Sequence, residues 1–217
     1  MTQLISSAVV IGGGIVGLTV FRALSAVLPD VVLLEKTSSL GQATSTRNSG
    51  VIHSGIYHPE KLLKGRLCRR GRSLLYEFCK ERGVPFNRCG KVVIASSKKE
   101  ISYIKKLHAA SKKLGVPSPE FLDSPEAVRQ FEPNVDALCG VRFPSTGVVD
   151  VPDLITKLHA DGLESGGEVL LNSNLTAVRR ATRALGPQST ETGWTLSVEQ
   201  GESESARTTM SEEDTSF

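Results

Sequence analysis

The sequence predicts an α/β fold built on a parallel β-sheet. Three features near its start predict it: an apolar segment at 8–11, a glycine-rich turn that opens a helix, and a second apolar segment at 31–34. Short strands that are apolar throughout are typical of parallel sheets, whose faces are covered by helices. The helix carries Leu18, Phe21 and Leu24 at helical spacing, so we expect it to pack on the two strands.

The glycine-rich turn has the spacing of a dinucleotide-binding site. Gly12 allows the tight turn, Gly14 lets the main chain approach a pyrophosphate, and Gly17 lets the helix pack closely on the strand. Ile15 and Val16 open the helix, where free N–H groups and the helix dipole stabilise an anion. A plain strand-to-helix connection is the alternative, but the flanking strands and helix favour a Rossmann-like nucleotide site.

An acidic residue ends the second strand. Glu35 follows Gly17 by 18 residues, the spacing that places a carboxylate on the hydroxyls of a ribose, and Lys36 belongs to the same expected site. A carboxylate there would repel a 2′-phosphate. The sequence therefore predicts FAD or NAD rather than NADP.

The next segments alternate between polar loop and helix. The stretch after Lys36 is rich in Ser, Thr, Gly and Asn and predicts a loop. Residues 61–82 carry eight Lys or Arg against two Glu, and their leucines (62, 63, 67, 74, 75) and Phe78 fall near helical spacing. We expect an amphipathic helix with a solvated basic face. Attraction of an anionic substrate or an acidic membrane surface stays open as a further role.

The middle of the chain predicts an α+β segment. Residues 92–95 form a strand, and a capping box of Ser97 and Glu100 opens a helix with its apolar face at 101, 104, 107 and 114. Ser124 and Pro125 begin a short helix that Pro133 ends. The remaining expected elements are a strand at 138–143, a turn at 144–147, a helix at 150–165, strands at 168–171 and 175–178, a polar loop at 181–192, a strand at 193–198 and a disordered tail at 199–217.

Composition excludes several classes of function. The 217 residues are 39% apolar and 23% charged, with a net charge of +3 that is too small to predict nucleic-acid binding. No stretch approaches the roughly 20 apolar residues of a membrane span. No signal peptide precedes the first strand, which predicts the cytoplasm by default, or the mitochondrion if a presequence is missing. The four cysteines (68, 79, 89, 139) form no C-x-x-C pair, so we expect packed, reduced thiols and no metal site.

A second motif, TRNSGVIHSGIYH at 46–58, is unusually dense in reactive and small residues. Together with the glycine turn, the LLYEFC stretch at 74–79 and the CGK stretch at 89–91, it resembles the D-amino-acid-oxidase-like FAD-dependent oxidoreductases, and among them the enzymes that oxidise L-2-hydroxyglutarate. The resemblance runs from about Ala8 to about Val178. It implies a Rossmann-like FAD-binding domain at 1–88 and 146–198, with part of an inserted α+β substrate domain at 89–145.

The resemblance implies a role for each part of the motif. FAD would occupy the glycine turn, with Thr46, Arg47, Asn48 and Ser49 beside its pyrophosphate. An exposed ion pair is the alternative for Arg47. The flavin ring would lie near Gly50, Val51 and His53, and the adenine would lie against the strand that contains Val178.

The implied reaction is oxidation of a 2-hydroxy acid by hydride transfer to flavin N5, with L-2-hydroxyglutarate converted to 2-oxoglutarate. His53 has a suitable pKa for the base, and Tyr57 is a second catalytic candidate. His58 is weaker, and a structural hydrogen bond is the alternative for both Tyr57 and His58. None of the arginines at 66, 69, 70 and 142 can be singled out as the carboxylate clamp. The electron acceptor would be a quinone, another carrier or oxygen.

Two other functions remain open. An amine or amino-acid oxidase of the same superfamily would share the cofactor site. Family members are about twice this length, so the chain resembles their N-terminal half. We therefore also expect weak FAD binding with slow turnover or none, as in a catalytically inactive nucleotide-binding remnant.

Overall fold

The computed structural model of the protein describes residues 4–186 and 189–201, and these residues form two compact units. One unit runs to Arg47 and resumes at Ile155, and the other covers Asn48–Leu154. These divisions differ from the domain boundaries expected at 88/89 and 145/146, which stay a prediction. None of the helices in the described part of the chain is long and apolar enough to cross a membrane.

The first unit contains the predicted parallel sheet. Its elements are β1 (Ala8–Ile11), α1 (Ile15–Ser25), β2 (Val31–Leu34), the 3₁₀ turn η1 (Thr44–Thr46), most of α5 (Val151–Glu164), β9 (Glu168–Leu170), β10 (Ser173–Gly186) and β11 (Ser189–Gln200). The strand order is β1–β2–β9, and both pairs are parallel, with Val9 opposite Val32 and Leu33 opposite Val169. The α/β prediction is therefore confirmed.

The two apolar strands differ in burial because of their places in the sheet. All residues of β2, the central strand, are buried. In β1, an edge strand within the described chain, only Val10 is buried, and Ile11 is 56% exposed. The expectation that segment 8–11 is buried throughout is wrong, because an edge strand has a neighbour on one side only.

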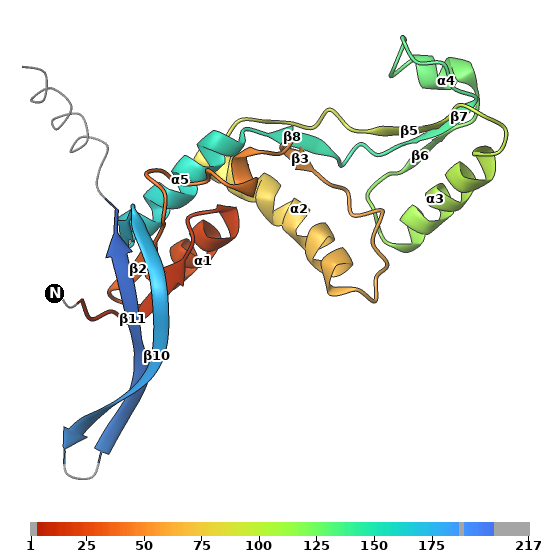
Figure 1. Ribbon diagram of the computed structural model, residues 1–217. Coiled ribbons are helices and arrows are strands. Elements are labelled where there is room, and N and C mark those ends of the chain that lie inside the picture. Colours follow the sequence, from red (N-terminus) through yellow and green to blue (C-terminus); the bar gives the residue numbers. More distant parts are fainter. Residues whose placement is uncertain (1–3, 187–188, 202–217) are drawn as a thin grey trace, which may run out of the picture. The chain divides into compact units, whose positions relative to one another are not determined.

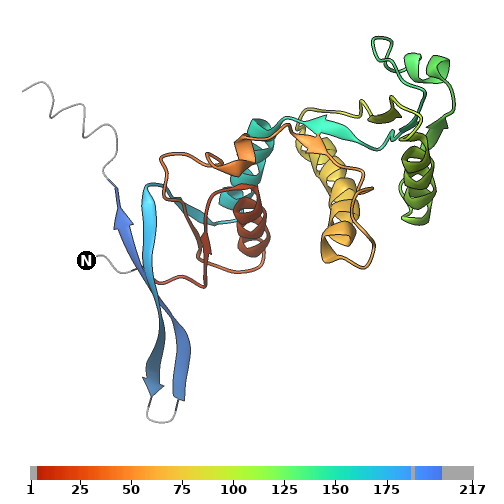
Figure 2. The ribbon, with the colours of Figure 1, turned by 45° about the vertical axis from the view of Figure 1, so that its right-hand side comes forward.

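Helices α1 and α5 lie side by side on one side of this sheet, and the β10–β11 hairpin lies on the other side (Figures 1 and 2). Phe21 of α1 is fully buried against Gly162 of α5, where a Cβ would stand 2.3 Å from the ring. Arg22 Nε donates to Asp161 Oδ2 at 2.6 Å. The side chain of Asp161 is only 8% exposed, so this ion pair ties the two helices together at a largely buried position.

Replacing Arg22 by methionine is expected to lower the free energy of unfolding by about 2–3 kcal/mol, because the buried carboxylate of Asp161 loses its cation. Urea denaturation measures the change. The matched control is Arg129→Met in the second unit, whose ion pairs with Glu126 and Asp136 are exposed and are worth about 0.5 kcal/mol or less each. Equal losses in the two variants would contradict the structural role of the Arg22–Asp161 pair.

The hairpin is longer than the sequence suggested. Strands β10 and β11 pair antiparallel, with Val178 opposite Leu196, and a bulge falls between Leu175 and Ala177. The prediction of a polar loop at 181–192 is wrong for residues 181–186 and 189–192, because these residues continue the two strands. Cross-strand hydrogen bonding extends a hairpin through polar residues, which an apolar-pattern search does not detect. β11 runs to Gln200, so the tail predicted from 199 begins too early, and its remainder beyond 201 lies outside the described residues.

The second unit contains two antiparallel sheets. Its elements are β3 (Val51–Ile52), α2 (Leu63–Arg82), β4 (Phe86–Asn87), β5 (Val92–Ala95), α3 (Ile101–Lys113), β6 (Glu120–Leu122), α4 (Pro125–Arg129), β7 (Cys139–Arg142) and β8 (Gly147–Val149). The strand orders of the two sheets are β3–β8–β4 and β5–β7–β6. The α+β character expected for 89–145 is therefore seen, while β3, β4, β6 and β8 were not expected.

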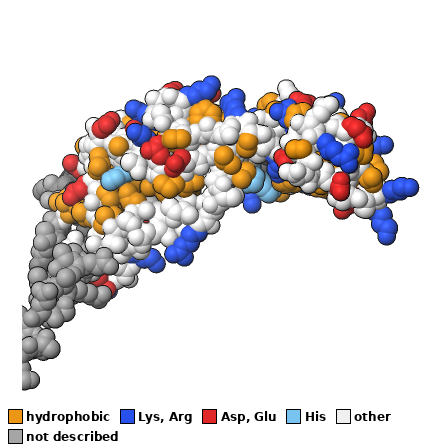
Figure 3. Space-filling model, turned by 90° about the horizontal axis from the view of Figure 1, so that it is seen from above, with side chains coloured by type: hydrophobic (Ala, Val, Ile, Leu, Met, Phe, Trp, Pro, Cys, Tyr) orange, Lys and Arg blue, Asp and Glu red, His pale blue; other side chains and the backbone are white. Residues whose placement is uncertain are grey.

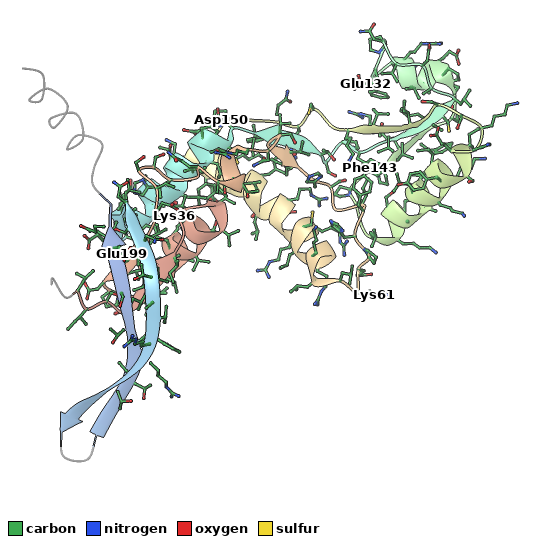
Figure 4. The ribbon with its side chains drawn as sticks, viewed as in Figure 1. Lys36, Lys61, Glu132, Phe143, Asp150 and Glu199 are labelled. Carbon is green, nitrogen blue, oxygen red and sulfur yellow. The ribbon has the colours of Figure 1, made fainter. Side chains whose placement is uncertain are left out.

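One hydrophobic core joins α3 to the β5–β7–β6 sheet. Ile104 and Leu107 of α3 are buried in it, as the helical spacing predicts. Phe143, labelled in Figure 4, follows β7 and is fully buried in the same core, together with Ile56 from the segment after β3. Ile56 therefore anchors its segment to the sheet.

Helix α2 forms as predicted, but most of its leucines do not lie on its buried face. Leu63, Leu67 and Leu74 are 60%, 56% and 51% exposed, whereas Tyr76 and Cys79 are buried. Figure 3 shows that hydrophobic side chains also lie at the surface of the molecule between charged ones. Helical periodicity gives the direction of an apolar stripe, but it does not say which neighbour covers that stripe.

The four cysteines are all unpaired, and they differ in burial. Cys79 and Cys139 are buried, Cys68 is half-buried and Cys89 is exposed. The expectation of packed thiols therefore fails for Cys89.

Candidate functional site

The glycine turn brings the end of β1 into direct contact with α1. Gly12 has a φ of +98°, and its N–H donates to the carbonyl of Leu34 at 2.8 Å. A Cβ on Gly17 would stand 1.9 Å from the carbonyl oxygen of Gly12. No side chain fits at Gly17, so the start of the helix lies as close to the turn as backbone atoms allow.

At the N-terminus of α1, one side-chain hydroxyl accepts a hydrogen bond from the backbone. Gly14 is the N-cap and carries no side chain, and the N–H of Ile15 donates to Ser45 Oγ at 2.9 Å. Ser45 lies in η1, in the polar loop after β2. The second sequence motif begins at Thr46 and does not include Ser45, so Ser45 was not predicted as a site residue. Only a fold that returns this loop to the helix end reveals it.

Glu35 lies beside the glycine turn, as its spacing suggested. Its Oε2 accepts the N–H of Gly13 at 2.6 Å, and its Oε1 accepts the N–H and hydroxyl of Thr37 at 2.9 and 2.8 Å. Burial raises the pKa of this carboxyl, but the hydrogen bonds outweigh it, so the pKa of Glu35 lies below 4.5. The carboxylate is ionised at neutral pH, and Oε2, which accepts one hydrogen bond from Gly13, keeps a lone pair for a hydroxyl donor.

The polar loop that follows holds its own backbone in place. Thr46 Oγ1 donates to the carbonyl of Gly41 at 2.7 Å, and the N–H of Gly41 donates to the carbonyl of Gly13 at 2.9 Å. Lys36, labelled in Figure 4, and Arg47 are exposed. Arg47 forms no ion pair with any described residue, so the described structure gives no support to the alternative that Arg47 serves in a surface ion pair.

In the second unit, the segment from Asn48 begins with a constrained glycine. Gly50 has a φ of +64°, and its carbonyl accepts the N–H of Val149 at 2.9 Å. A Cβ there would stand 2.7 Å from the carbonyl oxygen of Val149. The N–H of Gly50 also donates to Asn48 Oδ1 at 2.8 Å, and Val51 then pairs with Val148 in β8. Position 50 therefore requires a glycine for two reasons: its φ is positive, and a side chain there would clash with the carbonyl of Val149. Ser49 is exposed.

His53 is an exposed imidazole in a basic neighbourhood. Burial of part of the ring lowers its pKa, and the positive charges of Lys91 and His58 lower it further below 6.5. His53 is therefore neutral at neutral pH and can accept a proton. Tyr57, the other catalytic candidate, accepts a hydrogen bond from Lys91 Nζ at 2.8 Å.

The first unit fits the adenosine and pyrophosphate part of a dinucleotide. It offers a glycine turn, a helix whose N-cap residue is a glycine, and an ionised carboxylate next to that turn. Val178, predicted to lie against the adenine, is 48% exposed on β10. Among the described residues, no group of three or more His, Cys, Asp or Glu could hold a metal ion.

Comparison of the sequence with protein families finds one that covers most of the chain. The family model described as FAD dependent oxidoreductase, DAO, matches residues 7–206. The mitochondrial L-2-hydroxyglutarate dehydrogenase of Homo sapiens is 37% identical over 175 residues, which are 80% of this chain and 38% of that protein. The L-2-hydroxyglutarate dehydrogenase of Escherichia coli is 33% identical over 78% of this chain and 40% of that protein. The chain thus spans about two fifths of the relatives it matches.

Solved structures show the same fold. L-alpha-glycerophosphate oxidase from Mycoplasma pneumoniae, with FAD bound, superposes with a TM-score of 0.74 at 24% identity, over 79% of this chain and 46% of that one. L-proline dehydrogenase from P. horikoshii gives a TM-score of 0.72 at 23% identity, over 82% of this chain and 47% of that one. At these identities the likeness concerns the fold alone.

Proposed function

The chain belongs to the DAO family of FAD-dependent oxidoreductases, and we propose on that basis that it takes part in oxidising a 2-hydroxy acid, with L-2-hydroxyglutarate as the substrate. The family confirms the prediction of FAD as the cofactor. The observation that carries the proposal is the joint presence of the glycine turn with Glu35 beside it and of the segment around His53. Relatives named as L-2-hydroxyglutarate dehydrogenases, from bacteria to mammals, support the substrate.

The proposed cofactor contacts follow the chain. Gly14, Ile15 and Val16 would lie against the pyrophosphate, with the N–H groups of Gly14 and Val16 donating to it while the N–H of Ile15 is bonded to Ser45 Oγ. Glu35 would accept the ribose hydroxyls. Thr46 to Ser49 would line the pyrophosphate, and Gly50 to His53 would lie along the flavin. When bound, FAD supplies the acceptor for the two electrons of the oxidised carbon.

His53 is the proposed general base. Oxidation of a 2-hydroxy acid to a 2-oxo acid removes the hydroxyl proton while two electrons and a proton leave the carbon. The imidazole of His53 is neutral at neutral pH and exposed enough to meet a substrate. Its lowered pKa favours the proton-accepting form at neutral pH.

Two finer features of the protein remain proposals. Several relatives are named as mitochondrial, which favours the mitochondrial alternative over the cytoplasmic one. The electrons would pass from FAD to a quinone, another carrier or oxygen, as expected from the sequence.

Flavin reduction tests the proposed function. The purified chain is loaded with FAD, freed of excess cofactor and mixed without oxygen with L-2-hydroxyglutarate, its D-enantiomer, or glycine. We expect the flavin absorbance to bleach with the L-hydroxy acid alone. Bleaching by the amine instead would support the amine-oxidase alternative. Bound flavin that no substrate reduces would support the inactive remnant.

Replacing His53 by glutamine is expected to slow flavin reduction by a factor on the order of 10²–10⁴ while FAD binding persists. In the unchanged protein the rate should fall as the pH drops through the pKa of His53, which lies below 6.5. This acid limb should disappear in the variant. His159→Gln is the control, because that half-buried imidazole also has a lowered pKa but lies in the first unit. An unchanged rate in the His53 variant would refute its role as the base.

A further inference from the structure

A basic cluster on the second unit has no role in the cofactor site described above. We name it the 57/91 pair: Tyr57, which is 49% exposed, and Lys91, which lies just before β5. Lys91 Nζ donates to Tyr57 Oη at 2.8 Å and lies 4.4 Å from the centroid of the tyrosine ring. The hydroxyl proton of Tyr57 and the remaining ammonium protons of Lys91 are thus available to one acceptor.

The pair is held on a rigid base. Ile56, next to Tyr57, is buried in the core that contains Phe143. The backbone of Phe143 in turn exchanges two hydrogen bonds with Lys91: its N–H donates to the Lys91 carbonyl at 2.7 Å and its carbonyl accepts the Lys91 N–H at 3.2 Å. Both members of the pair are therefore fixed to the same core. Such support is what a binding site needs to keep its donors in place.

Neighbouring side chains reinforce this base and make it more positive. From α2, Arg69 donates to the carbonyls of Gly55 and His58 at 3.5 and 3.4 Å. Arg72 donates to the carbonyl of Ser54 at 3.2 Å. Both guanidinium groups thus bind backbone oxygens instead of carboxylates, and their charges are not cancelled by these contacts.

The positive charge of the pair is also not cancelled. Within the described part of the chain, Lys91 forms no ion pair with a carboxylate, and neither does His53 or His58. The charges that act on His53 are those of Lys91 and His58, both basic. An ammonium group that is bound to a phenol and forms no ion pair with a described carboxylate is a site for an anion.

We propose that Tyr57 and Lys91 form a carboxylate-binding site that holds the second carboxylate of a dicarboxylic 2-hydroxy acid. This inference rests on the proposed function and deepens it, because it assigns the group that distinguishes a dicarboxylate from a monocarboxylate. The Tyr57 hydroxyl and the Lys91 ammonium both donate to the carboxylate, and the electrostatic influence of Lys91 on His53 joins this site to the proposed base. Tyr57 accordingly serves in substrate specificity and not in proton transfer.

Direct binding tests the proposal without flavin chemistry. The full chain is titrated calorimetrically with glutarate, a dicarboxylate, and with butyrate, a monocarboxylate. We expect glutarate to bind at least about tenfold more tightly, and Lys91→Met to remove this preference. Tyr57→Phe, which keeps the ring, should weaken glutarate binding by a smaller factor. Lys98→Met, at an exposed lysine of the same unit, is the control and should bind like the unchanged chain. Circular dichroism checks that each variant is folded.

The outcomes separate this proposal from the proposed function. Equal binding of glutarate and butyrate by the unchanged chain, or unchanged glutarate binding in folded Lys91→Met, overturns the 57/91 site. Flavin reduction by both L-2-hydroxyglutarate and L-2-hydroxybutyrate, unaffected by Lys91→Met, would leave the proposed function standing and remove the site. Glutarate binding that depends on Lys91, in a chain whose flavin no hydroxy acid reduces, would support the site and remove the function.

Discussion

Replacing Gly17 by alanine is expected to lower the free energy of unfolding by about 3 kcal/mol or more and to abolish FAD binding. The added Cβ would stand 1.9 Å from the carbonyl oxygen of Gly12. That carbonyl cannot move aside freely, because the N–H of Gly12 is bonded to Leu34 and its φ is +98°. The helix must move instead, and with it the N–H groups proposed for the pyrophosphate.

A second helical glycine provides a matched control for this variant. Gly71 lies inside α2, and a Cβ there would meet nothing within 4 Å. Gly71→Ala should therefore stabilise the protein by about 0.5–1 kcal/mol, as expected for an unhindered helical position. Urea denaturation followed by circular dichroism and quenching of FAD fluorescence measure both effects. If Gly17→Ala were as stable as Gly71→Ala, the close contact of helix and turn would be disproved.

Local patterns predicted several helices and strands of each unit well. The glycine spacing and the two apolar segments gave β1, α1 and β2, and the capping pattern at Ser124 gave α4, where Ser124 Oγ accepts the N–H of Ala127. These elements depend on residues within a few positions of one another. A local pattern is therefore sufficient to specify them.

The features that the sequence missed depend on distant partners. Burial in β1 and α2 depends on which neighbours cover them, so Ile11 and Leu67 are exposed despite their apolar character. Ser45 is found at the helix end only because the loop returns across 30 positions to Ile15. Lys91 meets Tyr57 across 34 positions. Nothing in the local sequence around these residues encodes such contacts.

Glu35 could be placed from the sequence because a motif fixes both ends of its contact. The distance from Gly17 to Glu35 is set by one helix and one strand. The parallel pairing of β2 with β1 then returns the carboxylate at the end of β2 to the turn. The contact with the N–H of Gly13 follows from that geometry. Thr37, which holds the other oxygen, was not expected, because a hydroxyl two residues beyond a carboxylate has no distinctive pattern.

Replacing Glu35 by glutamine is expected to weaken FAD binding by a factor on the order of 100. A hydrogen bond to a charged group contributes about 1.5–3 kcal/mol, and 1.4 kcal/mol corresponds to a tenfold change in affinity. The amide nitrogen of glutamine also cannot accept the N–H of Gly13, which Oε2 now accepts at 2.6 Å. Fluorescence titration with FAD measures the change. Glu168→Gln, at an exposed carboxylate that starts β9, is the control and should bind FAD unchanged.

The pH dependence of stability tests the same carboxylate independently of the cofactor. Because the pKa of Glu35 in the folded protein lies below 4.5, its hydrogen bonds contribute stability that is fully present above pH 4.5. This contribution is lost as the pH falls through the lowered pKa. Glu35→Gln should therefore be less stable than the unchanged chain at pH 6, and the difference should shrink in acid. A difference in unfolding free energy that is constant from pH 6 to pH 3 would show that Glu35 is not held ionised beside the turn, and it would remove the physical basis for its contact with the ribose.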